Sequence, residues 1–168
     1  MYPKILALEK NILKYRSFQM ILLLHQVETL KSHTLNSIRS SDKIRGIRDR
    51  LPEGTKKVYK KLWKILVDEG IITENESEDL QDIIDIRNDI AHNIPKLFLD
   101  FTLKTQDKIY DYYALDRFEK YRDKIFENMS KNYTMTIGLP FFIPEKIIKE
   151  ELYRLNNKII KQVKKRKN

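Results

Sequence analysis

The sequence predicts an all-α fold, a bundle of four to five helices, and three observations lead to this prediction. Only 4 of the 168 residues are glycine and 5 are proline, while lysine, glutamate, leucine and isoleucine are abundant. Apolar residues recur at intervals of three and four over long stretches, which is the spacing of helices with a buried face. The length suits a single domain, expected to span 1–168, with a core of its own.

The first predicted helix begins near Pro3 and extends to about residue 35. Proline is favoured at the first position of a helix, where the N–H that it lacks would have no partner. The helix has enough leucines to be buried on more than one side, so we expect a bundle spine or a dimerisation element. His25 lies in the apolar run and is expected in the core, whereas His33 near the helix end is expected to be exposed.

A second helix is predicted from Thr55, a suitable N-cap, to Gly70, which would end it. Trp63, the only tryptophan, has helical spacing with its apolar neighbours and is expected in the core rather than as a base-stacking platform. Thr73 and Glu76 have the spacing of a capping box, which predicts the start of a third helix.

Two further helices are predicted at about 104–129 and about 144–163. The last helix again has a proline, Pro144, at its start. The basic tail that follows it, residues 164–168, is expected to be frayed.

The formal net charge of +9 is unevenly distributed along the chain. Residues 31–61 contain ten Lys or Arg and three Asp or Glu, and residues 158–167 contain six basic residues and no acid. Residues 68–89, in contrast, contain nine acids and one base. A basic chain suits a polyanionic partner, because each neutralised phosphate releases condensed counterions. The alternative is a solvated, lysine-rich surface.

Several of the arginines fall in a predicted basic connection at about 36–54. A connection of this length inside a compact domain is usually functional or disordered, and we expect nucleic-acid contact before disorder. Together with the tail, the residues expected to bind RNA are Arg45, Arg48, Arg50, Lys164, Lys165, Arg166 and Lys167.

The stretch 82–94 carries the features that suggest chemistry. Drawn as a helix, its apolar side chains share one face with Leu80, and its aspartates fall on the opposite face. Arg87 is the exception, because it lies about 20° from Leu80 and therefore within the apolar stripe. A cation there must be paired, or face a cavity or an interface, because an unpaired buried charge costs several kcal/mol.

His92 follows Arg87 by five residues, where the helix is expected to end before Pro95. Histidine is the side chain best suited to proton transfer near neutral pH. The negative end of the helix dipole and Asp89 nearby favour its protonated form. Asn88 shares a helix face with His92 and is placed to orient it by a hydrogen bond. The alternative is a core helix in which Arg87 makes a structural ion pair and His92 caps the end.

The segment Arg87-Asn88-Asp89-Ile90-Ala91-His92 resembles the R-x(4–6)-H signature of HEPN domains, in which a polar residue, often Asn, follows the arginine. That family is all-helical and frequently dimeric, and many members are metal-independent ribonucleases of abortive-infection, toxin–antitoxin and CRISPR-associated systems. The resemblance is local and implies a HEPN-like fold with three site residues: Arg87 binding phosphate, His92 catalytic and Asn88 supporting. One toxin branch, paired with a nucleotidyltransferase antitoxin, often has a tyrosine two residues after the histidine, where this chain has Ile94.

We therefore expect an endoribonuclease of a prokaryotic defence or toxin system that uses no metal or other cofactor and acts on RNA as a homodimer. The ribose 2′-OH would attack the adjacent phosphate, with His92 transferring a proton and Arg87 stabilising the developing charge. The resemblance also implies a cognate antitoxin or defence-system partner. Two alternatives stay open: a non-catalytic helical module that binds RNA, nucleotide or protein, and a structural dimerisation protein.

The same sequence suggests a cytoplasmic protein without membrane association. Its N-terminal apolar residues are interrupted by Lys4, Glu9 and Lys10, unlike a secretory signal. The longest apolar run, residues 20–24, is too short to cross a bilayer. The absence of cysteine excludes disulfides and Cys-based metal sites, and it fits a reducing compartment.

Overall fold

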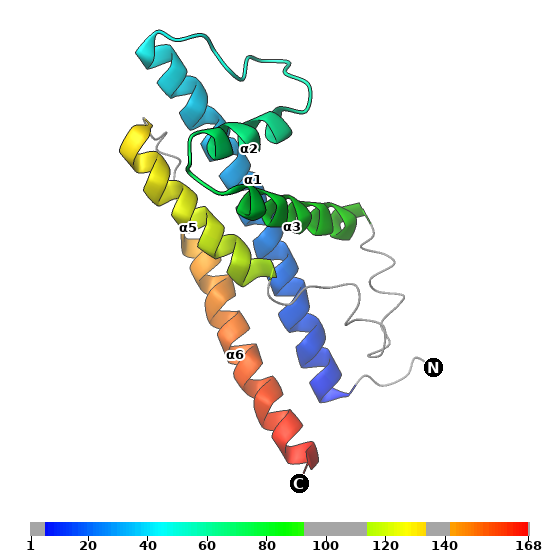
Figure 1. The fold of residues 1–168 in the computed structure, drawn as a ribbon. Coiled ribbons are helices and arrows are strands. Elements are labelled where there is room, and N and C mark those ends of the chain that lie inside the picture. The colour runs from blue at the N-terminus through cyan, green and yellow to red at the C-terminus, as the bar shows by residue number, and fades with distance from the viewer. Residues whose placement is uncertain (1–5, 93–113, 134–141, 168) are drawn as a thin grey trace. The chain divides into compact units, whose positions relative to one another are not determined.

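The computed structural model describes residues 6–92, 114–133 and 142–167, which form five helices and no strand (Figure 1). The helices are α1 (Ala7–Arg45), α2 (Val58–Asp68), α3 (Glu74–His92), α5 (Ala114–Asn132) and α6 (Phe142–Lys167). The prediction of an all-α fold is confirmed for this part of the chain, and the HEPN-like fold stays a prediction. The helices predicted at about 104–129 and 144–163 correspond to α5 and α6, with residues 104–113 outside the described part.

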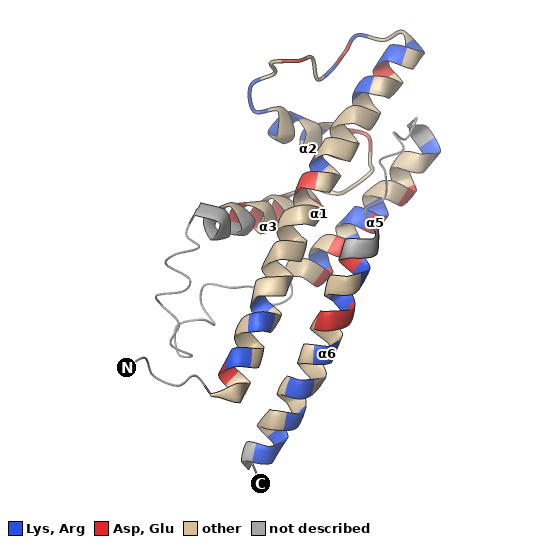
Figure 2. Ribbon diagram, turned by 180° about the vertical axis from the view of Figure 1, so that it is seen from behind, with Lys and Arg blue, Asp and Glu red and all other residues tan. Residues whose placement is uncertain are grey.

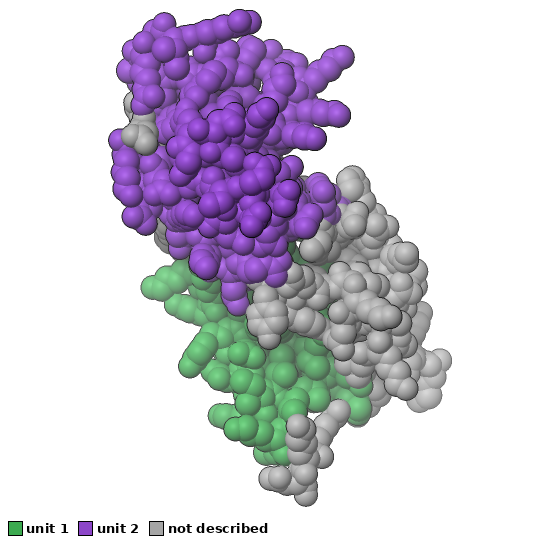
Figure 3. All heavy atoms as spheres, viewed as in Figure 1, with its two compact units in different colours: residues 1–24, 139–168 green, residues 25–138 purple. Residues whose placement is uncertain are grey.

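The chain divides into two compact units (Figure 3). One unit consists of residues 1–24 and 139–168, and the other consists of residues 25–138. Helix α1 contributes its first part to one unit and its remainder to the other. That both units fold together as the single domain expected at 1–168 stays a prediction.

In the unit of residues 1–24 and 139–168, the described structure consists of the first part of α1 and of α6. The Asn11 side-chain N–H donates a hydrogen bond of 3.0 Å to Gln162 Oε1, which joins the two helices. Leu8, Leu152 and Leu155 are buried.

Helix α6 continues to Lys167 and so includes residues 164–167 of the tail, whose fraying stays a prediction. Lysine, arginine and glutamine are good helix formers, and the segment after Ile160 contains no glycine or proline that would stop the helix. Figure 2 shows lysines and arginines repeated along this helix.

In the unit of residues 25–138, helices α1, α2, α3 and α5 all contribute to a core. The face of α3 predicted to be apolar is buried, with Leu80, Ile83 and Ile84 exposed by 0, 0 and 7 %. Trp63 is also buried, as predicted. The other helices add further buried side chains: Val27, Leu30, Leu62, Leu66, Phe118, Ile125 and Met129.

Helix α1 ends ten residues later than predicted, so the connection expected at about 36–54 begins only after Arg45. The serine-rich end of the helix has modest helix propensity, but Ser37, Ile38 and Ser41 are buried there, and burial overrides propensity. Gly46 then ends the helix with a φ of 64°, a left-handed conformation that glycine adopts without strain.

The start of α2 also differs from the prediction. The N-cap is Lys57 rather than Thr55, and it makes no side-chain capping hydrogen bond. The Thr55 hydroxyl instead donates to the Pro52 carbonyl oxygen at 2.6 Å, which closes a turn before the helix. The hydroxyl is therefore used in the connection and not by the helix.

Both histidines of α1 differ from their expected environments. His25 is exposed, so its assignment to the core is wrong. His33, expected to be exposed, is half-buried against Phe126 of α5 with ring centroids 4.9 Å apart, and this burial lowers its pKa. The number of leucines predicted burial of this part of α1 on more than one side, but the side that carries His25 is exposed.

Candidate functional site

Helix α3 carries the predicted catalytic residues, and its start is fixed by the predicted capping box. The Thr73 backbone N–H donates to Glu76 Oε2 at 2.8 Å, and the Glu76 backbone N–H donates to the Thr73 hydroxyl oxygen at 3.3 Å. Such a pair satisfies two of the N–H groups that a helix start leaves without intrahelical partners. The capping box therefore fixes where α3 begins and, with it, which residues of the helix share a face.

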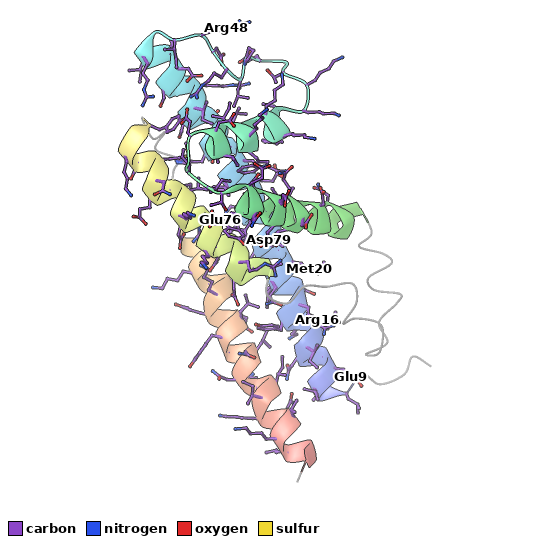
Figure 4. The ribbon with its side chains drawn as sticks, in the orientation of Figure 1. Glu9, Arg16, Met20, Arg48, Glu76 and Asp79 are labelled. Atoms are coloured by element: carbon purple, nitrogen blue, oxygen red, sulfur yellow. The ribbon has the colours of Figure 1, made fainter. Side chains whose placement is uncertain are left out.

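Two acidic residues near the start of α3 attach the helix to α5 (Figure 4). The Asp79 carboxylate accepts hydrogen bonds from Arg117 at 2.9 and 3.0 Å and from the Tyr121 hydroxyl at 2.6 Å. The Lys124 ammonium contacts both Glu76 carboxylate oxygens, at 2.7 and 2.6 Å. Two of the nine acidic residues in the stretch 68–89 therefore form ion pairs with basic side chains of α5.

These contacts shift the ionisation of both carboxyl groups. The Lys124 ammonium and the Thr73 backbone N–H lower the pKa of Glu76. Burial alone would raise the pKa of Asp79, but the hydrogen bonds from Arg117 and Tyr121 outweigh it and the pKa is lowered. Both groups are thus held as carboxylates near neutral pH.

The motif itself lies in the last two turns of the described part of α3. The side chains of Arg87 and His92 are outside the described residues, so only their helix positions are known. Position 87 follows buried Ile83 by four residues and buried Ile84 by three, which assigns it to the core-facing stripe. Asn88 is half-buried, and position 92 follows it by one turn.

Asn88 lines a pocket between α1, α2 and α3, which we call the α2–α3 pocket. Its volume is about 620 Å³. The lining consists of lysines, aromatic rings, aliphatic side chains and polar groups: Lys31, Thr55, Lys57, Val58, Tyr59, Lys60, Trp63, Gln81, Ile84, Asp85 and Asn88. Gln81, Asp85 and Asn88 form one helical stripe of α3, and position 92 continues that stripe by periodicity.

Lys31 is the buried cation of this pocket, with 7 % of its surface exposed. Its ammonium lies 4.7 Å from the centre of the Tyr59 ring and 3.3 Å from Glu28 Oε1. The aromatic face and the carboxylate both stabilise the charge. With Lys57, Lys60 and one carboxylate, Asp85, the lining carries three cations and one anion.

The basic residues expected to bind RNA have different environments in the described part of the chain. Arg45 and Arg48 are exposed (Figure 4 labels Arg48). Arg50 instead donates to Asp42, to Glu69 and to the Tyr133 hydroxyl, so its guanidinium has a structural role. RNA contact by any of the three stays a prediction.

The tail residues Lys164 and Lys165 are exposed on α6, whereas the side chains of Arg166 and Lys167 are outside the described residues. The tail belongs to the unit of residues 1–24 and 139–168, and the motif belongs to the other unit. RNA binding by the tail also stays a prediction.

Sequence reasoning missed the α2–α3 pocket. The helical spacing of Trp63 correctly predicts that it is buried, but it does not reveal that the Trp63 and Tyr59 rings both line a pocket. The one sequence signal was the density of lysines around these rings, at positions 56, 57, 60, 61 and 64. The buried Lys31 on α1 carries no such signal, because its neighbours in sequence are not its neighbours in space.

Among the residues that the structure describes, no group of three or more His, Cys, Asp or Glu side chains is arranged to hold a metal ion. No helix in the same part is long and apolar enough to cross a membrane.

Comparisons with known proteins return no relative. No family model matches the chain, and neither a curated protein nor a solved structure does.

Proposed function

We propose that the chain is a metal-independent, HEPN-like endoribonuclease that cleaves RNA by attack of the ribose 2′-OH on the adjacent phosphodiester. His92 transfers a proton, Arg87 binds the scissile phosphate and Asn88 orients His92. A role in a prokaryotic defence or toxin system, with a cognate antitoxin or other partner, follows from the resemblance of the motif alone.

The observation that carries this proposal is the position of the motif on a helix beside a cation-rich pocket. Asn88 lines the α2–α3 pocket, and position 92 follows on the same stripe of α3. Position 87 falls on the stripe of buried Leu80, Ile83 and Ile84, where a cation needs an anionic partner. A substrate phosphate is a partner of suitable charge and geometry for arginine.

The reaction needs little more than these groups. The 2′-OH loses a proton as its oxygen attacks phosphorus, and the 5′-oxygen gains a proton as its bond to phosphorus breaks. Histidine accepts or donates such protons near neutral pH, and a guanidinium stabilises the extra negative charge of the pentacoordinate phosphate. The products are a 2′,3′-cyclic phosphate and a 5′-hydroxyl.

A second candidate function is non-catalytic binding of RNA or nucleotide, and the α2–α3 pocket favours it. A pocket with three lysines and two aromatic rings has the composition of a nucleotide site whether or not cleavage follows. Cleavage of RNA distinguishes the two candidates.

The decisive experiment is an RNA-cleavage assay with analysis of the product ends. We expect cleavage of a mixed RNA pool in EDTA, with 2′,3′-cyclic phosphate ends or their hydrolysis products. His92→Ala should lower the rate by about 10²–10⁴-fold, the usual contribution of a proton-transfer group, and Arg87→Ala by about 10²–10³-fold, the usual contribution of one charge-stabilising group, without loss of helical circular dichroism. His25→Ala, at an exposed histidine of α1, is the matched control and should cleave as the wild type does.

Two results would reject the assignment. Wild-type cleavage by His92→Ala would remove His92 from the mechanism. Products with 3′-hydroxyl ends and a strict requirement for magnesium would indicate a different reaction.

A further inference from the structure

The cleavage chemistry uses one residue of the α2–α3 pocket, Asn88, and leaves the rest of its lining without a role. Four of the remaining charged and polar groups fall into two sets. Lys57 and Lys60 come from the start of α2, and Gln81 and Asp85 come from α3. The rings of Tyr59 and Trp63 also line the pocket.

The first set suits a phosphate. Lys57 and Lys60 are both exposed, so their ammonium groups are available to a ligand. The start of α2 has no side-chain cap and no acidic residue in its first turn, so nothing in the helix neutralises the positive end of its dipole. Lys31, whose ammonium lies 4.7 Å from the Tyr59 ring centre and is paired with Glu28, also belongs to this lining.

The second set suits a planar group that donates hydrogen bonds. The Gln81 amide nitrogen donates to the Ser77 carbonyl oxygen and to the Ser77 hydroxyl, both at 3.2 Å, so its carbonyl oxygen is the atom left for a ligand. Asp85 is exposed, and its carboxylate also accepts hydrogen bonds. The half-buried Tyr59 ring offers an aromatic surface in the same lining.

We propose that the α2–α3 pocket binds one nucleotide of the RNA chain and prefers a base with an exocyclic amino group. Lys57 and Lys60 hold its phosphate, the Tyr59 ring supports the base, and Gln81 and Asp85 accept hydrogen bonds from the amino group. The identification of the ligand as RNA rests on the proposed function, whereas nucleotide binding in the pocket is testable without cleavage. Because Asn88 borders both the pocket and the motif, the bound nucleotide lies next to the phosphate that is cleaved.

A comparison of cytosine with uracil tests the preference for an exocyclic amino group most directly. The two bases have the same ring size, but cytosine carries an amino group where uracil carries a carbonyl oxygen. Two acceptors on α3 favour the amino group and repel the carbonyl oxygen. 5′-CMP should therefore bind about fivefold or more tightly than 5′-UMP, in line with the discrimination usual for a specific base contact.

Trp63 gives a direct measure of binding, because it is the only tryptophan of the chain and it lines the pocket. His92→Ala protein, which should fold as the wild type does but not cleave, is titrated with 5′-CMP, 5′-UMP and inorganic phosphate while the tryptophan emission is recorded. We expect a saturable change for 5′-CMP, a weaker affinity for 5′-UMP, and the weakest for phosphate. Phosphate binding as tightly as 5′-CMP would reject a nucleotide site in favour of a simple anion site.

Asp85→Asn tests the base contact. It removes the charge that favours the amino group and introduces an amide that can donate to uracil. The ratio of 5′-CMP to 5′-UMP affinity should fall to about one or below. An unchanged ratio would show that Asp85 does not contact the base.

The lysines have a matched control on the same helix. Lys57→Asn with Lys60→Gln removes two charges from the pocket, and asparagine suits position 57 because the backbone there is left-handed, with a φ of 52°. Lys61→Gln with Lys64→Gln removes two exposed charges of α2 that do not line the pocket. The pocket variant should weaken 5′-CMP binding about tenfold or more, and the control should change it less than twofold, because exposed charges outside the site are screened. Equal losses would reject the site.

The two proposals fail separately. If the wild-type protein cleaves RNA but 5′-CMP gives no saturable signal at Trp63, the pocket proposal is wrong and the ribonuclease proposal stands. If 5′-CMP binds as described but no RNA is cleaved, the pocket proposal stands and the ribonuclease proposal is wrong.

Discussion

The Asp42 carboxylate near the end of α1 is buried and forms an ion pair with the Arg50 guanidinium of the following connection, whose side chain is 29 % exposed. Arg50 Nη2 lies 2.8 Å from Asp42 Oδ1, and the Arg50 backbone N–H donates to Asp42 Oδ2 at 3.1 Å. The Asp42 side chain is only 1 % exposed. The same guanidinium also bonds Glu69 and the Tyr133 hydroxyl, so Arg50 connects the ends of α1, α2 and α5.

Arg50→Ala should therefore lower the free energy of unfolding by about 2–3 kcal/mol, because the buried Asp42 carboxylate loses its charged partner and keeps only the backbone N–H of residue 50. Urea unfolding followed by circular dichroism measures this loss. Arg48→Ala, two residues earlier and exposed, should change stability by less than about 0.5 kcal/mol. Similar stability of the two variants would show that the Asp42–Arg50 pair does not hold the connection.

Acid should weaken the attachment of α3 to α5. The pKa values of Glu76 and Asp79 are lowered from their ordinary 4.5 and 3.8, so the folded state binds fewer protons than the unfolded state near these values. Stability from these groups is fully present above about pH 5 and is lost as the pH falls through the lowered pKa values. Glu76→Gln with Asp79→Asn should cost about 1–2 kcal/mol at pH 7, and this difference from the wild type should shrink as the pH falls below 4.

The measurement is the urea midpoint from pH 7 to pH 3. Glu78→Gln, at an exposed carboxylate of the same helix, is the control and should run parallel to the wild type. A double variant whose deficit is constant over this range would contradict the assignment of the pH dependence to these two groups.

The capping residues illustrate what the sequence predicts well and where it fails. Thr73 and Glu76 have a reciprocal signal, in which each residue supplies the partner of the other, and the predicted box is present. Thr55 is a single residue with the same capping chemistry, and its hydroxyl is taken by the Pro52 carbonyl oxygen instead. A local prediction is more reliable when two residues must agree.

The larger errors have a tertiary cause. Helix α1 extends through a serine-containing segment because Ser37, Ile38 and Ser41 are buried there and Asp42 pairs with Arg50, and local propensity does not encode such contacts. The α2–α3 pocket is similarly invisible, since its walls come from residues 31, 55–63 and 81–88 on separate helices. The amphipathic pattern correctly predicted that Leu80, Ile83 and Ile84 are buried, because that pattern is a property of α3 itself.

Neutralising the basic tail should weaken RNA binding through its salt dependence. Because residues 164–167 are helical, glutamine replacements of Lys164, Lys165, Arg166 and Lys167 preserve helix propensity. Each lost phosphate contact lowers the slope of log affinity against log salt by about 0.7 for single-stranded RNA, so the slope should fall by up to about 2.8.

Four exposed lysines elsewhere, replaced by glutamine, provide a control with the same net charge: Lys10, Lys14, Lys120 and Lys131. A slope that falls equally in both proteins would indicate a general charge effect and no specific role of the tail.

Cleavage should require a homodimer in which each active site combines Arg87 of one chain with His92 of the other. Five residues on an ideal helix turn the backbone by about 500°, so positions 87 and 92 project about 140° apart and do not naturally converge within one helix. A two-fold axis near the ends of the two α3 helices would bring the residues together from different chains. It would also account for an arginine at a position on the core-facing stripe of α3, because that part of the stripe would face an interface with bound phosphate.

Co-refolding an Arg87→Ala chain with a His92→Ala chain tests this arrangement. If the sites are shared, half of a random mixture is heterodimer and each heterodimer has one intact site of two, so activity should recover to about a quarter of the wild type. Each variant refolded alone should stay inactive and serves as the control. A mixture that also stays inactive would show that each site is built within one chain. A wild-type protein that sediments as a monomer at the concentration of the assay, yet cleaves RNA, would exclude the dimer altogether.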